Sequence, residues 1–366
     1  MDVSDRLIGR RTVLGAGGAG LAGAAFGGLA RPALAQGKKF KVVLSNSYIG
    51  NKWRLEMENV FKAALQMEPY KSSIEGSWFN SDNDVSKQSQ QLSNVIAQRP
   101  DAILINAASP TGLNGIINQG AARDILMIAF DNTVTTPKCL KVNTSQSEMG
   151  RAWADFLVKK MNGRGNVIMV TGVAGTEVDQ ARIKGAEEVF EKAPGIKVVN
   201  RYTGMWDSST AERNTAAILP SLPQIDGIWC QGGTDGVIKA FISANRPVPP
   251  VAGEAENGFR RFMVGYNGQK VDGLSIGQPP YLSVISLELA RRILIGQHPK
   301  QDLLVPLAPL TSDQVKLGET AFADQPDSFF ADFTDGGDHP ILKLCVTAAL
   351  DGTPCSGRLD VNLPAV

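Results

Sequence analysis

The sequence contains little histidine and cysteine, and almost no charge imbalance. Its 366 residues include two histidines, His298 and His339, which leaves little for a histidine-rich metal site or for histidine general-base chemistry, although carboxylates could still act as bases. The formal net charge of +1 argues against a nucleic-acid-binding protein, which normally carries a basic excess on one face. No nucleophile elbow, metal-ligand spacing or serine–histidine pairing is apparent, so we expect no catalytic residue, no metal and no cofactor.

The four cysteines show no C-x-x-C spacing that would indicate metal binding or redox chemistry. Cys345 and Cys355 are close in sequence and could form a disulfide across a C-terminal loop. Cys230 lies in an apolar run and is expected to be a buried thiol, while Cys139 has no obvious partner. We therefore expect structural roles for all four.

The composition is that of a folded protein with a substantial core. Hydrophobic residues make up 43% of the chain and charged residues 20%, which excludes a disordered chain. The length suits two domains or one large α/β domain.

The first 35 residues have the pattern of an export signal. Arg10 and Arg11 precede an uncharged stretch over residues 13–30, and a small-residue site, Ala-Leu-Ala, ends at Ala35. A retained membrane helix is the alternative, but the high glycine content argues against it. The paired arginines resemble a twin-arginine signal, and the general secretory route also remains open. Cleavage after Ala35 would change the formal net charge from +1 to −1 and place the protein outside the cytoplasm.

Short apolar runs alternate with helical patterns along the rest of the chain. Strands are predicted over residues 40–45, 74–79, 101–107, 125–130, 166–170, 197–202, 227–231, 248–253 and 274–276. Helices are predicted over residues 53–65, after Asp84, after Pro110, over 178–192, 208–219 and 234–244, from 257, and over 281–295. This alternation predicts an α/β fold with parallel sheets, and its repetition on either side of residue 145 predicts two lobes joined by a hinge.

Polar and aromatic residues follow many of the predicted strands. Ligands of open α/β sheets bind at the carboxyl ends of strands, so we expect the site there. Aromatic faces, amides and carboxylates together suit a polyhydroxylated ligand. Glycines at the same ends are expected to let the backbone approach the cleft: Gly172, Gly175, Gly232 and Gly233.

Each of these residues also has a purely structural interpretation. Asn106 could cap the following helix, and Asp131 could stabilise a turn. Trp53 and Trp206 could be core residues. Arg182 and Glu254 could be solvated. A ligand site is favoured because all of these residues lie together at strand ends.

Several stretches resemble the ribose-binding-protein group of periplasmic sugar-binding proteins. They are residues 42–45, 101–106, 128–131, 172–176, 182–185 and 276–278. The resemblance spans about residues 40–300 in consistent order, and residues 45–54 are similar to a lengthened first ligand loop. It implies two Rossmann-like lobes of the type I periplasmic binding fold. The N-terminal lobe would comprise residues 36–143 and 279–310, and the C-terminal lobe residues 144–278 and 311–366, the latter including a C-terminal extension.

The resemblance also implies ligand-binding residues in the first lobe. Four positions match polar contacts of the family: Ser45, Asn51, Asn106 and Asp131. Trp53 matches an aromatic residue that sandwiches the sugar. Arg54 stands where the ribose binders have a second aromatic residue, and Asn132 replaces an arginine.

In the second lobe, Arg182 matches a family arginine and Trp206 the opposing aromatic residue. Glu254 matches a carboxylate that is usually aspartate, and Gln278 matches an amide beside the hinge. Thr234 falls where the ribose binders have asparagine. The departures from the family pattern put ribose itself in doubt.

The resemblance therefore implies a monomeric substrate-binding component of a sugar ABC transporter in the periplasm. It would bind a monosaccharide or polyol between its lobes and deliver it to an inner-membrane ABC permease. The alternative is a periplasmic sugar sensor that presents its ligand to a chemoreceptor or sensor kinase. A repressor of the same fold would need a DNA-binding motif ahead of Phe40, where the sequence shows an export signal instead.

Overall fold

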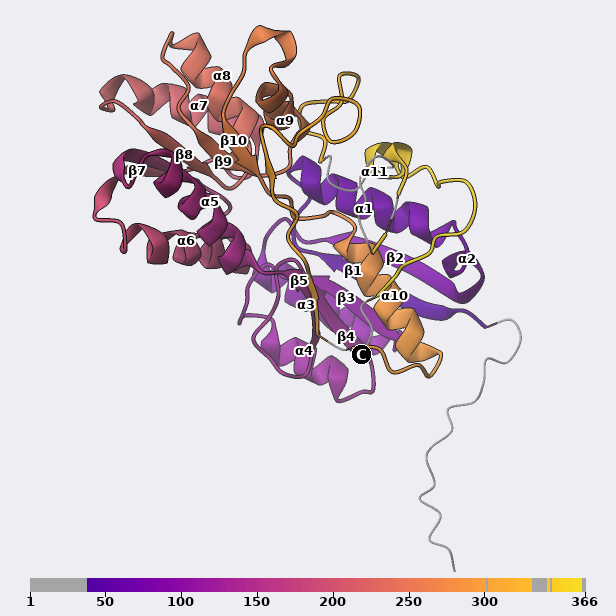
Figure 1. The fold of residues 1–366 in the computed structure, drawn as a ribbon. Coiled ribbons are helices and arrows are strands. Elements are labelled where there is room, and N and C mark those ends of the chain that lie inside the picture. Colours follow the sequence, from indigo (N-terminus) through magenta and orange to yellow (C-terminus); the bar gives the residue numbers. More distant parts are fainter. Residues whose placement is uncertain (1–37, 301, 331–340, 343, 364–366) are drawn as a thin grey trace, which may run out of the picture.

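The computed structural model describes residues 38–300, 302–330, 341–342 and 344–363. The predicted signal and its cleavage site lie outside these residues. Within them, no helix has the length and apolarity needed to cross a membrane. Two α/β lobes lie one beside the other, each built around its own sheet (Figure 1).

The N-terminal lobe is built on a six-stranded parallel sheet. Its order is β11 (Leu303–Val305), β5 (Leu140–Thr144), β4 (Leu126–Phe130), β3 (Ala102–Asn106), β1 (Phe40–Asn46) and β2 (Ile74–Asn80). Its helices are α1 (Lys52–Leu65), α2 (Tyr70–Ser73), α3 (Val85–Ala97), α4 (Asn114–Ala121), α10 (Leu282–Leu294) and α11 (Val346–Asp351). Apolar side chains of α1 and α10 pack in one cluster with the sheet, and those of α3 and α4 in another. Both faces of the sheet are therefore covered, which explains why its central strand β3 is buried at every residue.

The C-terminal lobe repeats this architecture. Its sheet has the order β12 (Leu310–Thr311), β10 (Gly273–Ser275), β9 (Val251–Gly253), β8 (Gly227–Cys230), β6 (Arg164–Thr171) and β7 (Gly195–Thr203). The helices are α5 (Gln146–Lys160), α6 (Glu177–Phe190), α7 (Ser208–Ile218), α8 (Thr234–Ser243) and α9 (Asn257–Val264), with 3₁₀ turns η1 (Leu219–Ser221) and η2 (Tyr266–Gly268). Among the neighbouring strands that the structure describes, all pairs in both sheets are parallel except the antiparallel edge pair β10–β12.

Polar side chains cap the starts of α1, α3 and α6. The Asn51 side chain accepts a hydrogen bond from the Arg54 N–H at the start of α1. Thr176 caps α6 in the same way. The predicted cap Asp84 is confirmed, because it accepts a hydrogen bond from the Lys87 N–H at the start of α3.

Within the described residues, the chain passes between the lobes four times. It leaves the N-terminal sheet after β5, returns from β10 to α10, and then adds β11 to the first sheet and β12 to the second. A fourth passage follows β12, because α11 packs against α1 of the N-terminal lobe (Figure 1).

The predicted assignment of residues 311–366 to the C-terminal lobe is therefore wrong for their distal part. Val315 and Ala321 do belong to the core of the C-terminal lobe. Phe329, Leu342 and Ala348 instead join the apolar cluster of α1 and α10. The reason is hydrophobic burial, because the extension covers apolar surface beside α1.

The cysteine predictions agree with the structure. Cys345 and Cys355 form a disulfide in the extension. Cys139 and Cys230 are free, buried thiols, and burial raises the pKa of each to about 12.

Candidate functional site

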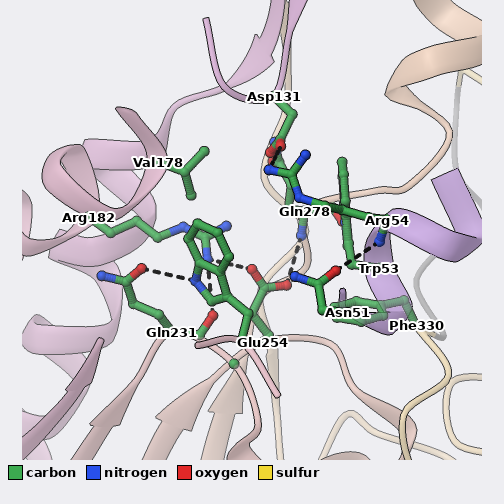
Figure 2. A pocket seen from close by; sticks show the side chains of 12 residues that line it. Asn51, Trp53, Arg54, Asp131, Val178, Arg182, Gln231, Glu254, Gln278 and Phe330 are labelled. Atoms are coloured by element: carbon green, nitrogen blue, oxygen red, sulfur yellow. Dashed lines mark hydrogen bonds and ion pairs between the residues drawn. The ribbon is translucent and has the colours of Figure 1, made fainter. Parts of the chain in front are cut away.

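A pocket with about 340 Å³ of empty space lies between the two lobes, at the carboxyl ends of their strands (Figure 2). Its walls are Asn51, Trp53, Arg54, Asp131, Val178, Arg182, Trp206, Gln231, Gly232, Glu254, Gln278 and Phe330. Both lobes and the C-terminal extension contribute to it.

Eight of the twelve predicted site residues line this pocket. They are Asn51, Trp53, Arg54, Asp131, Arg182, Trp206, Glu254 and Gln278. The other four, Ser45, Asn106, Asn132 and Thr234, are buried but do not line it.

Arg54 lies on the first turn of α1 and is held from several sides. Its guanidinium donates hydrogen bonds to Asn46 Oδ1 and Ser47 Oγ, each at 3.0 Å, and lies 3.7 Å from the Asp131 carboxylate. Burial lowers the pKa of Arg54, and the negative charge of Asp131 opposes this shift. The side chain is 2% exposed, so these contacts fix the cation in the pocket wall.

Asp131 follows β4 and adopts a left-handed backbone conformation, with φ of 57°. One of its carboxylate oxygens accepts hydrogen bonds from the side-chain amides of Asn106 and Asn132, both at 2.9 Å. Asn106 and Asn132 therefore orient the carboxylate from behind the pocket. Asn106 is not a helix cap, since the following helix α4 begins at Asn114.

Ser45 is also one layer removed from the pocket. Its hydroxyl accepts a hydrogen bond from Gln88 Nε2 at 3.0 Å, and the same amide donates to the Asn106 carbonyl at 3.0 Å. The contact stabilises the end of β3 beside the site.

Arg182 pairs with Glu254 in the C-terminal lobe, with 2.6 Å between Nη1 and Oε1. The guanidinium also donates to Gln146 Oε1 at 2.8 Å and to the Gln231 carbonyl at 3.1 Å. It lies 5.3 Å from the ring centroid of Trp153. Arg182 is 1% exposed and Glu254 is 4% exposed. The alternative that these two side chains face solvent is therefore wrong.

Trp206 projects over the backbone of two glycines. Its indole N–H donates to Gln231 Oε1 at 3.2 Å. A Cβ on Gly172 would lie 2.0 Å from the indole ring, and one on Gly232 would lie 3.2 Å away. These two glycines therefore make room for the indole. They were expected to let the backbone approach the cleft, and what they admit is the Trp206 side chain.

Gln278 joins the two halves of the site. Its carbonyl accepts a hydrogen bond from the Trp53 indole N–H at 2.5 Å, and its amide nitrogen donates to Asp131 Oδ1 at 3.1 Å. Its backbone N–H lies 3.4 Å from Glu254 Oε2. The amide oxygen accepts a hydrogen bond from the Thr144 hydroxyl. This residue thus links the carboxylates of both lobes at the point where the chain crosses between them.

Thr234 lies away from the pocket, at the start of α8. Its backbone N–H, at the start of α8, donates to Glu256 Oε2 at 2.8 Å, and the Gly233 N–H donates to Oε1. Burial raises the pKa of Glu256 to about 8, helped by Asp235 and Glu254 and opposed by these two N–H groups.

Four pocket residues were not among the predicted set: Val178, Gln231, Gly232 and Phe330. Gln231 and Gly232 directly follow β8, so they lie at a strand end, where ligand contacts were expected. Val178 is the second residue of α6. Phe330 lies in the extension, where no periodic pattern marked it.

The pocket matches each cation with an anion. Arg54 lies beside Asp131, and Arg182 beside Glu254. Amide groups and two indole rings complete its walls. Among the described residues, no cluster of histidine, cysteine or carboxylate side chains could hold a metal ion. The chemistry offered is hydrogen bonding to hydroxyl groups and packing against C–H surfaces.

Comparison with known proteins gives a consistent result. A family model described as periplasmic binding protein domain matches residues 42–298. The xylitol-binding protein of Mycolicibacterium smegmatis is 25% identical over 252 residues, covering 67% of this chain and 71% of the relative. The ribose import binding protein of Bacillus subtilis is 21% identical over 273 residues, covering 74% and 87%. The structure of an ABC transporter solute-binding protein from Thermobispora bispora has a TM-score of 0.74 at 26% identity, over 90% of this chain and 99% of that one.

Proposed function

Because this chain belongs to the periplasmic binding protein domain family, we propose that it is the substrate-binding component of a sugar ABC transporter. It binds a neutral monosaccharide or polyol between its lobes and delivers it to an inner-membrane permease. The observation that carries this proposal is the pocket between the lobes, which is lined by indoles, amides and matched charges from both lobes.

The charge pairing favours a neutral ligand. Arg54 and Arg182 each lie beside a buried carboxylate, Asp131 and Glu254 respectively. A ligand carboxylate or phosphate would face an anion next to each cation, and like charges at short range are costly in a buried site. Hydroxyl groups can instead donate to the carboxylates and accept from the guanidiniums, forming charge-assisted hydrogen bonds.

Lobe closure provides the second part of the mechanism. Asn132 Oδ1 accepts a hydrogen bond from the Val178 N–H of α6 at 3.2 Å, directly from one lobe to the other. Gln278 contacts carboxylates of both lobes. Contacts of this kind form only when the lobes meet, so a ligand that bridges them stabilises the closed state and is enclosed by it.

The proposal includes export to the periplasm with cleavage after Ala35, and action as a monomer without nucleic acid. The Cys345–Cys355 disulfide supports an oxidising compartment, because disulfides persist outside the cytoplasm. The relatives that the chain matches are binding proteins, which supports a carrier that releases its ligand unchanged.

A thermal-shift screen of residues 36–366 tests the proposal. Neutral pentoses, hexoses, deoxysugars and polyols, including xylitol and D-ribose, are compared with sugar acids and sugar phosphates. A ligand at 100 times its Kd stabilises the folded state by about 2.7 kcal/mol, which is readily measured. We expect neutral compounds to stabilise the protein and anionic ones to have no effect. A flat response to all neutral compounds would refute the proposal.

A further inference from the structure

The segment 327–330 of the C-terminal extension lies between the lobes and is attached to both. On the C-terminal lobe, the Asp327 carboxylate pairs with Lys239 at 2.9 Å and with Arg261 at 2.8 Å. The backbone N–H groups of Asn257 and Gly258, at the start of α9, donate to the carbonyls of Phe329 and Asp327 at 2.7 and 2.8 Å. The segment is therefore seated against α9 by both charge and backbone hydrogen bonds.

The same segment is attached to the N-terminal lobe by its side chains. Phe329 and Phe330 are 1% and 5% exposed, and both belong to the apolar cluster of α1 and α10. The Phe330 N–H donates to the carboxylate of Glu56 on α1 at 3.2 Å. This N–H contact and the packing hold the Phe330 ring in one place.

Phe330 reaches the pocket between the lobes from the extension. Its ring lines the pocket on the side of Trp53 and Asn51 (Figure 2). In the first ligand loop, residues 45–54, the aromatic residue that lines the pocket is Trp53, and the neighbouring Arg54 offers no aromatic face. The extension places a second one at the same wall.

We propose that Phe330 is a specificity-determining residue of the pocket, replacing the aromatic face that Arg54 cannot provide. This inference rests on the proposed sugar-binding function. A phenyl ring offers no hydrogen bond, so it selects for a C–H surface on the ligand. Since a sugar ring presents a fixed C–H face and an open-chain polyol does not, Phe330 favours cyclic ligands.

Substitution of Phe330 and its neighbour separates ligand contact from structural packing. Phe330→Leu and Phe330→Met keep an apolar side chain in the cluster and remove the flat face. Phe329→Leu is the matched control, because Phe329 is buried in the same cluster but does not line the pocket. Affinities for the neutral panel compounds, including D-ribose and xylitol, are measured by calorimetry, and melting temperatures are measured without ligand.

We expect both Phe330 variants to bind cyclic ligands about three- to ten-fold more weakly, the size of a lost aromatic contact, with a smaller loss for acyclic polyols. Phe329→Leu should lower the melting temperature without changing the relative affinities. If Phe330→Leu does not fold, Phe330→Met decides the question. Unchanged affinities in a folded Phe330 variant would overturn the inference while leaving the sugar-binding function intact, whereas a wild-type protein that binds no neutral compound would overturn both.

Discussion

Glu177 lies where α6 of the C-terminal lobe meets the N-terminal lobe, and it makes lobe closure sensitive to pH. Its Oε2 atom is buried without a hydrogen-bond partner among the residues that the structure describes. Burial raises the pKa of Glu177 from 4.5 to about 7, and the nearby Asp131 carboxylate adds to the shift. A hydrogen bond with the Thr133 backbone and the charges of Arg182 and Lys141 oppose it.

The sign of the effect follows from the raised pKa. When the lobes separate, Glu177 becomes solvated and its pKa returns toward 4.5. The stability of the lobe contact is therefore fully present below about pH 4.5 and is lost as the pH rises through about 7. The full shift corresponds to about 3 kcal/mol, which partial exposure of the side chain reduces to about 2 kcal/mol. This is about a thirty-fold change in the ratio of closed to open protein.

Glu177→Gln removes this titration while preserving the shape of the side chain. We expect the wild type to have a larger radius of gyration at pH 8 than at pH 5 in small-angle X-ray scattering without ligand, and the variant to stay compact at both. Ligand affinity should be higher in the variant at pH 8, and the difference from the wild type should disappear as the pH falls toward 4.5. Glu191→Gln, an exposed change at the other end of α6, is the control. Identical pH dependence of wild type and Glu177→Gln would refute the reasoning.

Two further predictions concern the pocket and the extension. Asp131→Ala and Trp206→Ala should each weaken ligand binding by about ten-fold or more, since a buried polar group left unpaired costs ~1–3 kcal/mol. If calorimetry gave wild-type affinity for both variants, the assignment of these residues to the ligand site would be contradicted. Replacing Cys345 and Cys355 by serine opens a loop with a sequence separation of 10 and should lower the free energy of unfolding by about 3 kcal/mol. Urea denaturation measures this loss, and an unchanged midpoint would show that the extension unfolds independently of the core.

The strands of the core could be predicted from the sequence because they are buried on both faces. β1 and β3 consist of near-continuous apolar runs, and each predicted range differs from the observed one by at most one residue at either end. β5 was not predicted. Its sequence, LKVNT, includes Lys141 and Asn143, which are half-buried, so it lacks a continuous apolar run.

The site was predicted less completely, because a strand end locates a backbone and not the direction of each side chain. Asp131 and Asn132 are adjacent, yet the carboxylate faces the pocket and the neighbouring amide orients it. Only three-dimensional hydrogen bonding distinguishes the two. Phe330 could not have been predicted from its position relative to a strand. Packing against the core of the N-terminal lobe decides where it lies, and nothing in the local sequence encodes that contact.

The extension also affects how the two halves of the site separate. Its links to the C-terminal lobe are the Asp327 ion pairs, which are about one-third exposed and contribute little, and the backbone hydrogen bonds to Asn257 and Gly258, worth about 0.5–1.5 kcal/mol each. Its links to the N-terminal lobe include two aromatic side chains in the core, whose burial is worth about 1.5–3 kcal/mol each and therefore more in total. Opening should therefore break the contacts with α9 and leave Phe330 beside Trp53. The N-terminal half of the pocket would then keep both aromatic faces in the open state, so the ligand can bind there first and the C-terminal lobe can close over it.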